Sequence, residues 1–164
     1  MVQLLISYLV DSEPQHLSAI HARGADQPEA FQKLSEIPGQ RMPDVPMYVL
    51  VDGQTHSAAD ALAYDLQALQ RATVVGARTR GGAHLVDFYP LYGTFVLMLP
   101  IARAINPITG QNWQGVAVKP DIEAPADDAL QVAHRAALKD LLALAADADE
   151  RAFLQAEMET LVRD

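Results

Sequence analysis

A serine that begins a helix directly after a buried strand is the residue of this chain best placed to act as a nucleophile. Ser57 follows the apolar run 47–51 and the turn residues Asp52 and Gly53, and it precedes an amphipathic stretch. At such a position the hydroxyl projects from the edge of a sheet, and the free amides of the first helical turn can stabilise an oxyanion. Serine is also a common helix cap, so the local pattern leaves both interpretations open.

A serine nucleophile needs a base within reach. The chain has three lysines, all distant from Ser57 in the sequence: Lys33, Lys119 and Lys139. Nearby arginines do not lose their proton and cannot serve. His84 follows the second strand of this region and is expected at the same sheet edge as Ser57, so we predict it as a possible base; a plain loop histidine is the alternative. His56 adjoins Ser57, but neighbouring residues on a helix point apart, which argues against it.

Two acidic residues could orient the His84 ring, namely Asp60 and Asp87. Asp60 stands three residues after Ser57, and this spacing is more simply that of a capping box. The remaining histidines, His16, His21 and His134, do not have metal-ligand spacing with each other or with carboxylates. We therefore expect neither a metal site nor a cofactor.

The elements around Ser57 are predicted to form a strand–helix–strand unit. Run 47–51 is continuously apolar, as in a parallel strand covered on both faces. In the following helix, Leu62, Leu66 and Leu69 lie on one face. A second apolar strand, 72–75, stops at Gly76. Short connections of this kind are typical of a βαβ unit, which places the chain in the α/β class.

Further elements flank this unit on both sides. Before it we expect a helix over 1–10, a strand over 15–22 that could lie at an edge, and a long excursion over 23–45. The excursion is expected to hold one helical turn near 29–34, with Lys33 as a solvated charge. After it we expect strands over 85–89 and 94–100, a turn at 91–93 between them, and two closing helices. An apolar stripe marks the first of these helices, and other apolar residues mark the second: Leu130, Ala133, Ala137, Leu141 and Leu144, then Phe153, Leu154, Met158, Leu161 and Val162.

Bulk composition bounds the possible functions. The 164 residues carry a net charge of −9, which argues against nucleic acid or an anionic membrane as the main partner. The absence of cysteine excludes disulfides, cysteine–zinc sites and a thiol nucleophile. No apolar run approaches the roughly 20 residues that a membrane span needs. The apolar start, 1–10, lacks the flanks of a convincing signal peptide.

Several short motifs, in order and at matching spacing, resemble one known family. They are the segments Thr55–Asp60, Leu66–Gly76, Thr79–Gly82, Ile105–Val116 and Val118–Ile122, with the helix start Asp128–Leu130. Together they closely resemble the tail-specific, or C-terminal-processing, serine peptidases. Within that family the likeness is strongest to the branch similar to interphotoreceptor retinoid-binding protein, and it spans about residues 1–140.

This resemblance implies a ClpP/crotonase-like α/β fold of stacked βα units. It implies that Ser57 matches the nucleophile and that the backbone amide of Ala58 matches one oxyanion donor. Where members with a Ser–Lys dyad have lysine, this chain has Gly82. Gln114 stands at the position of the family glutamate and cannot ionise. The family also carries Glu rather than Asp at position 60.

The resemblance also implies that the chain is one partial peptidase-like domain, N-terminally truncated. Its catalytic core is expected over about 1–125 and its C-terminal helices over about 126–164. The family's Asp-Leu-Arg-x-Asn-x-Gly-Gly segment, which supplies the other oxyanion donor, would stand before Met1. Relatives of this type are usually exported, and this chain carries no signal for it.

We therefore expect a serine peptidase fragment that cleaves peptides through an acyl-enzyme on Ser57, inactive as given if the missing groups are essential. The alternative is a non-catalytic module that binds an apolar ligand or a peptide. An unpaired sheet edge and exposed apolar surface would favour a homo-oligomer.

Overall fold

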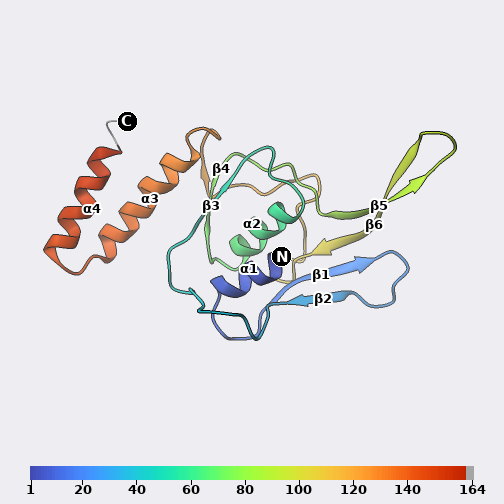
Figure 1. The fold of residues 1–164 in the computed structure, drawn as a ribbon, viewed down its shortest axis with the longest axis horizontal. Helices are drawn as coiled ribbons and strands as arrows, with labels where there is room; N and C mark the ends of the chain where they lie inside the picture. The colour runs from blue at the N-terminus through green and yellow to red at the C-terminus, as the bar shows by residue number, and fades with distance from the viewer. Residues whose placement is uncertain (162–164) are drawn as a thin grey trace.

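The computed structural model describes residues 1–161 (Figure 1). Groups of strands stand between α1, α2 and α3, and two helices close the chain. The helices are α1 (Val2–Leu9), α2 (Ala58–Ala68), α3 (Ala129–Leu144) and α4 (Ala148–Thr160). The strands are β1 (His16–Ala22), β2 (Glu29–Gln32), β3 (Tyr48–Val51), β4 (Thr73–Gly76), β5 (His84–Pro90), β6 (Val96–Ile105) and β7 (Ile122–Glu123). The predicted mixed α/β class is confirmed.

A parallel sheet of order β3-β4-β7 forms the frame behind Ser57. β3 and β4 pair in parallel from Tyr48 opposite Thr73 to Val51 opposite Gly76, with α2 between them in the sequence. The predicted βαβ unit is therefore confirmed. The predicted cover on both faces of β3 is wrong at Leu50, whose side chain is exposed. Helix α3 contacts β3, with Tyr48 bonded to Asp140, but it does not cover Leu50.

The apolar face of α2 packs against α1 as its leucine spacing predicts. Leu66 is fully buried in one cluster with Ile6, Val10 and Leu17, and Leu62 and Leu69 pack against this cluster. On the other side of α2, Ala63 joins a second cluster that includes Val51, Val74, Trp113 and Val118. The second cluster anchors the loops that surround Ser57.

The second sheet is antiparallel, in the order β2-β1-β6-β5. β1 lies between β2 and β6, so the prediction that it could be an edge strand is wrong. The strands expected over 85–89 and 94–100 are confirmed as β5 and β6. Their outer parts form a hairpin that extends away from the body, and α3 and α4 lie at the opposite end of the molecule (Figure 1).

The excursion before β3 differs from its prediction in two ways. Segment 29–32 is strand β2, not a helical turn, because it pairs antiparallel with β1 from Glu29 to Gln32. Lys33 is buried rather than solvated, and its Nζ donates a 2.8 Å hydrogen bond to the Ser12 carbonyl. Pairing with a distant strand outweighs the weak local preference.

The two closing helices form as predicted, and part of each predicted apolar set is buried. Ala133 and Leu154 are buried and Met158 and Leu161 pack on the cluster between the helices, whereas Leu130, Leu144 and Phe153 are exposed. Leu138 and Ala145, which lie outside the predicted sets, are buried where α3 and α4 meet. Val162 lies outside the described residues. Over residues 1–161 no helix combines the length and the apolar composition that a membrane crossing requires.

Candidate functional site

Ser57 stands at the N-cap position of α2 in a backbone conformation that side-chain-bearing residues rarely adopt. Its φ is 58° and its ψ is −115°, and its side chain makes no capping hydrogen bond. Such a conformation costs of order 1–3 kcal/mol and persists only where the surroundings impose it. Ser57 therefore does not cap α2 through its side chain, and the exposed hydroxyl is free for another role.

The turn before Ser57 is held by its own polar groups. One carboxylate oxygen of Asp52 accepts hydrogen bonds from the amides of Gln54 and Thr55, at 2.8 and 3.0 Å. The Thr55 hydroxyl accepts from the Asp52 amide, and the Thr55 carbonyl accepts from the Arg80 amide at 2.9 Å. These bonds fix the chain on the approach to Ser57 and so maintain its strained conformation.

Asp60 connects the first turn of α2 to the neighbouring glycine loop. Its side chain is fully buried, and its two carboxylate oxygens accept from the amides of Gly81 at 3.4 Å and Gly82 at 3.1 Å. It makes no hydrogen bond to the amide of Ser57 in residues 1–161, so the capping-box interpretation is wrong. Asp60 instead stabilises the position of the loop relative to Ser57.

Gln114 holds the next part of the same loop. Its Oε1 accepts from the amides of Ala83 at 2.8 Å and His84 at 3.0 Å. The neighbouring Trp113 donates from Nε1 to the Gly82 carbonyl at 3.0 Å. Amide oxygen and carboxylate oxygen both accept such bonds, so glutamine preserves this anchoring while removing the charge.

The imidazole of His56 fills the space beside Gly82. A β-carbon on Gly82 would lie 2.1 Å from Nε2 of His56. A lysine in place of Gly82 would therefore clash with this ring.

A cavity of about 520 Å³ brings most of the predicted site residues together. Ser57, Ala58, Gly82 and His84 line it, as the sequence predicts for Ser57 and His84. The remaining lining is mainly apolar: Val2, Leu17, Ile20, Phe31, Ala61, Ala83, Leu85, Val86, Ile101, Ala104 and Trp113, with Gln3 and Ser18.

Neither acid that was expected to orient the His84 ring does so. Asp60 is bonded to the glycine loop, and Asp87 accepts from the amide of Phe88 at 2.8 Å. Within the described part of the chain, the ring of His84 makes no hydrogen bond; only its backbone amide does, to Gln114. The expectation of an Asp60 or Asp87 partner for His84 is therefore wrong.

A buried acid–amide pair behind the cavity was not predicted. Nδ2 of Asn106 donates to Oδ1 of Asp65 at 2.8 Å, and both side chains are buried. Burial raises the pKa of Asp65 to about 7, against the lowering effect of the Asn106 hydrogen bond. Oδ1 of Asn106 accepts from the amides of Ile108 and Thr109. In the sequence, the only hint of this pair is that Asn106 precedes Pro107, which is a frequent turn signal.

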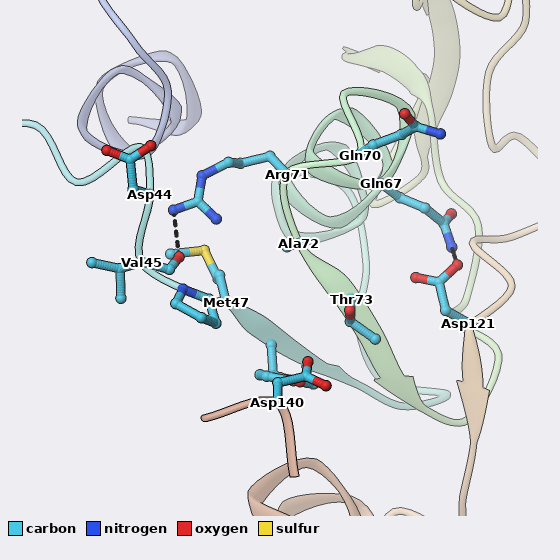
Figure 2. Close-up of a pocket in the computed structure, with 12 residues that line it drawn as sticks. Asp44, Val45, Met47, Gln67, Gln70, Arg71, Ala72, Thr73, Asp121 and Asp140 are labelled. Atoms are coloured by element: carbon cyan, nitrogen blue, oxygen red, sulfur yellow. Dashed lines mark hydrogen bonds between the residues drawn. The ribbon is translucent and has the colours of Figure 1, made fainter. Parts of the chain in front are cut away.

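A second pocket, of about 440 Å³, lies at the opposite end of strands β3 and β4 from Ser57 (Figure 2). Figure 2 shows Arg71 directed at the segment that holds Asp44 and Val45, and Gln67 directed at Asp121. Nη2 of Arg71 donates to the carbonyls of Met42 and Val45 at 2.7 and 2.8 Å. These polar groups connect separate segments of the chain.

Tyr48 and Asp140 also line this second pocket and are hydrogen-bonded to each other. Partial burial, followed by the hydrogen bond and charge of Asp140, raises the pKa of Tyr48 to about 12. The pair connects β3 to α3. It serves packing between these elements and is remote from the Ser57 cavity.

Comparison with known proteins gives consistent matches. Peptidase family S41 matches residues 4–124. A carboxy-terminal-processing protease of Bartonella bacilliformis is 29% identical over 103 residues, which are 63% of this chain and 23% of that protein. This chain thus spans about a quarter of that relative's length.

Solved structures agree with the fold. The photosystem II D1 C-terminal processing protease matches with a TM-score of 0.59 and 19% identity, over 76% of this chain and 31% of that one. Mature CPAF complexed with lactacystin matches with a TM-score of 0.63 and 16% identity, over 78% of this chain and 37% of that one. The match over residues 4–124 shows that this chain belongs to peptidase family S41.

Proposed function

We propose that this chain carries the nucleophile of a serine peptidase and that Ser57 forms an acyl-enzyme with a peptide. The observation that carries the proposal is the strained, uncapped Ser57 at an apolar cavity. Oγ attacks the peptide carbonyl carbon and loses its proton to a base. The C–N bond then breaks, the amine leaves with that proton, and water hydrolyses the ester. Peptides or proteins are the substrates that family S41 membership implies.

The backbone amide of Ala58 is proposed as the oxyanion donor in this chain. It is the first amide of α2, where helix amides lack partners and the positive end of the helix dipole lies. It also lines the cavity beside Ser57. Each such donor contributes about 10²–10³ in kcat, so one donor alone supports a slow reaction.

His84, the base predicted from the sequence, lines the same cavity as Ser57, which supports that prediction. Gln114 occupies the position at which the family resemblance places a glutamate. We propose that it acts as a positioning residue, because it holds the amide of His84 without supplying a charge. The site therefore has an anchored loop but no carboxylate to stabilise an imidazolium at His84.

A second candidate function is the binding of an apolar ligand or peptide without catalysis. The cavity lining favours it, since most of its side chains are apolar and a volume of about 520 Å³ suits a small molecule. The sequence likeness to the interphotoreceptor retinoid-binding branch points the same way. Stacked βα units of the ClpP/crotonase type remain our proposal for the fold in detail, supported by β3–α2–β4.

Peptide hydrolysis separates the two functions. The folded chain is incubated with a pool of unlabelled peptides from a digested protein, and products are identified by mass spectrometry. We expect new cleavage products that are lost in Ser57→Ala. Binding of an apolar fluorescent probe that is equal in both proteins, without any cleavage, would instead support the binding module.

A further inference from the structure

A pocket of about 410 Å³ on the antiparallel sheet is lined by four basic side chains. His21 of β1 stands directly opposite Arg103 of β6, and Arg103 stands directly opposite His84 of β5. Residues opposite each other in an antiparallel pair have β-carbons about 4.5–5.5 Å apart on one face of the sheet, so these three form a row. Arg23 follows two residues after His21, and its amide donates to the Ile101 carbonyl at 2.8 Å, which holds its backbone against β6.

No acid neutralises this basic pocket within the described part of the chain. Neither Asp nor Glu lines it, and the side chains of Arg23 and Arg103 make no ion pair in residues 1–161. The whole chain has 21 acidic residues against 12 lysines and arginines, so the pocket is opposite in charge to the molecule as a whole. Guanidinium groups carry only donors. An anionic acceptor is therefore the ligand that this set of side chains fits.

The basic pocket adjoins the cavity that holds Ser57. Two residues, His84 and Ile101, line both. His84 belongs to β5, which is the last strand in the order of its sheet. The two hollows therefore meet at one edge of the sheet, and a single ligand can occupy both.

The two hollows open on opposite faces of that sheet. Ile20 and Ala104 line the Ser57 cavity, and each is the chain neighbour of a residue of the basic row, His21 or Arg103. Successive residues of a strand point to opposite faces. An extended peptide alternates its side chains in the same way. A peptide that lies along the β5 edge therefore directs one side chain into the apolar cavity and the adjacent one toward the basic pocket.

We propose that His21, Arg23, His84 and Arg103 bind the carboxylate of an Asp or Glu side chain in a peptide whose neighbouring apolar residue occupies the Ser57 cavity; this rests on the proposed peptidase function. The planar guanidinium group matches a carboxylate with two parallel hydrogen bonds. The imidazole rings add donors on either side of Arg103. The pocket thereby gives the site a preference for substrates with an acidic residue beside an apolar one.

Binding is tested by NMR of the imidazole signals of the folded chain. Glutamate capped as its N-acetyl α-methylamide is added at constant pH and ionic strength. We expect the ring signals of His21 and His84, assigned with His21→Gln and His84→Gln, to shift until they saturate. Those of His16 and His134, which do not line the pocket, should stay in place. Glutamine with the same caps, which has the shape without the charge, should shift none of them.

A matched pair of arginine variants locates the binding. Arg103→Gln removes one charge from the pocket and is expected to weaken the affinity for capped glutamate about fivefold, as for an exposed charge pair. Arg135→Gln removes the same charge from α3, outside the pocket, and should bind as wild type does. Thermal unfolding verifies that both variants are folded.

The cleavage products of the peptide pool supply the second readout. We expect Asp and Glu to be enriched within two residues of the cleaved bonds, and this enrichment to be lost in Arg103→Gln and kept in Arg135→Gln.

Several outcomes overturn the inference. They are equal shifts with capped glutamine or with sodium chloride, an unchanged affinity in Arg103→Gln, and cleavage that shows no preference for acidic residues. A pool that stays uncleaved while His21 and His84 respond to capped glutamate contradicts the peptidase function alone and supports the carboxylate site.

Discussion

Two regions of the molecule are held together by opposite kinds of contact. One is the set of loops around Ser57, residues 52–60, 79–84 and 113–114, called the loop layer here; the other is the outer part of the β5–β6 hairpin. In the loop layer, polar groups are buried and bonded: Asp60 is fully buried against two amides, and Trp113 donates to Gly82. In the hairpin, large apolar side chains are exposed, with Tyr92 at 98% and Phe95 at 73%. Yet the two regions are continuous, because β5 starts directly after Ala83 and β6 ends beside Ala104, and both alanines are in the core.

The difference between these regions shows that strand pairing can form a hairpin without burying its side chains. β5 and β6 pair from His84 opposite Arg103 to Pro90 opposite Val96, and this ladder is sufficient to form the hairpin. It does not bury the hairpin, because nothing in residues 1–161 packs over its outer part. The positions of the residues near Ser57 are instead fixed by hydrogen bonds from side chains of three separate segments: 52–55, Asp60 and 113–114. We therefore expect the loop layer to be sensitive to single changes and the hairpin to be tolerant of them.

The largest change in the free energy of unfolding is expected from the titration of Asp65, the buried acid bonded to Asn106. Burial raises the pKa of Asp65 from 3.8 to about 7. Between these values the folded protein keeps a proton that the unfolded chain has released, so the free energy of unfolding falls as pH rises through this window, by up to about 4 kcal/mol. Urea unfolding at several pH values measures it. Asp65→Asn should flatten this dependence; an equally steep fall in that variant would refute the assignment.

A smaller loss in the free energy of unfolding, confined to the wall of the Ser57 cavity, is expected when Asp60 is replaced. Asp60→Ala leaves the amides of Gly81 and Gly82 without their acceptor, which should lower the free energy of unfolding by about 2–4 kcal/mol and disorder the cavity wall. Asp60→Asn keeps one acceptor oxygen and should lose less. Asp87→Ala in the hairpin is the matched control, because Asp87 bonds only the next amide, and about 0.5 kcal/mol or less is expected there. Equal losses at both positions would contradict the contrast between the regions.

The smallest effect on stability is expected in the hairpin itself, together with a change in assembly. We propose that exposed apolar side chains there support a homo-oligomer. Replacing Phe88, Tyr92 and Phe95 together by serine should leave the free energy of unfolding nearly unchanged and shift the size-exclusion peak toward the monomer. A wild-type monomer peak at all concentrations would contradict the proposal.

The framework of the site follows from local patterns. Apolar runs and leucine spacing predict β3, α2 and β4, and the turn signals predict the β5–β6 hairpin. Ser57 and His84 are placed at one cavity because both follow the ends of adjacent parallel strands. These features depend on periodicity and on chain direction, which a sequence displays directly.

The remaining features depend on contacts between distant segments. Strand β2 exists because β1 pairs with it, and Lys33 is buried because the Ser12 carbonyl meets it. The backbone angles of Ser57 are imposed by the Asp52 turn and the glycine loop, not by serine's own preference. Helix α2 begins at Ala58, so helical side-chain directions do not apply to His56 and Ser57. Only the folded arrangement shows that the His56 ring needs Gly82.

Covalent labelling tests the central claim, that Ser57 is a nucleophile, most directly. The folded chain is treated with a fluorophosphonate, and its intact mass and labelled peptide are determined beside Ser57→Ala. We predict a single adduct, located on Ser57 and absent from the variant. A folded wild-type chain that acquires no adduct, or an adduct that persists in Ser57→Ala, would contradict the claim.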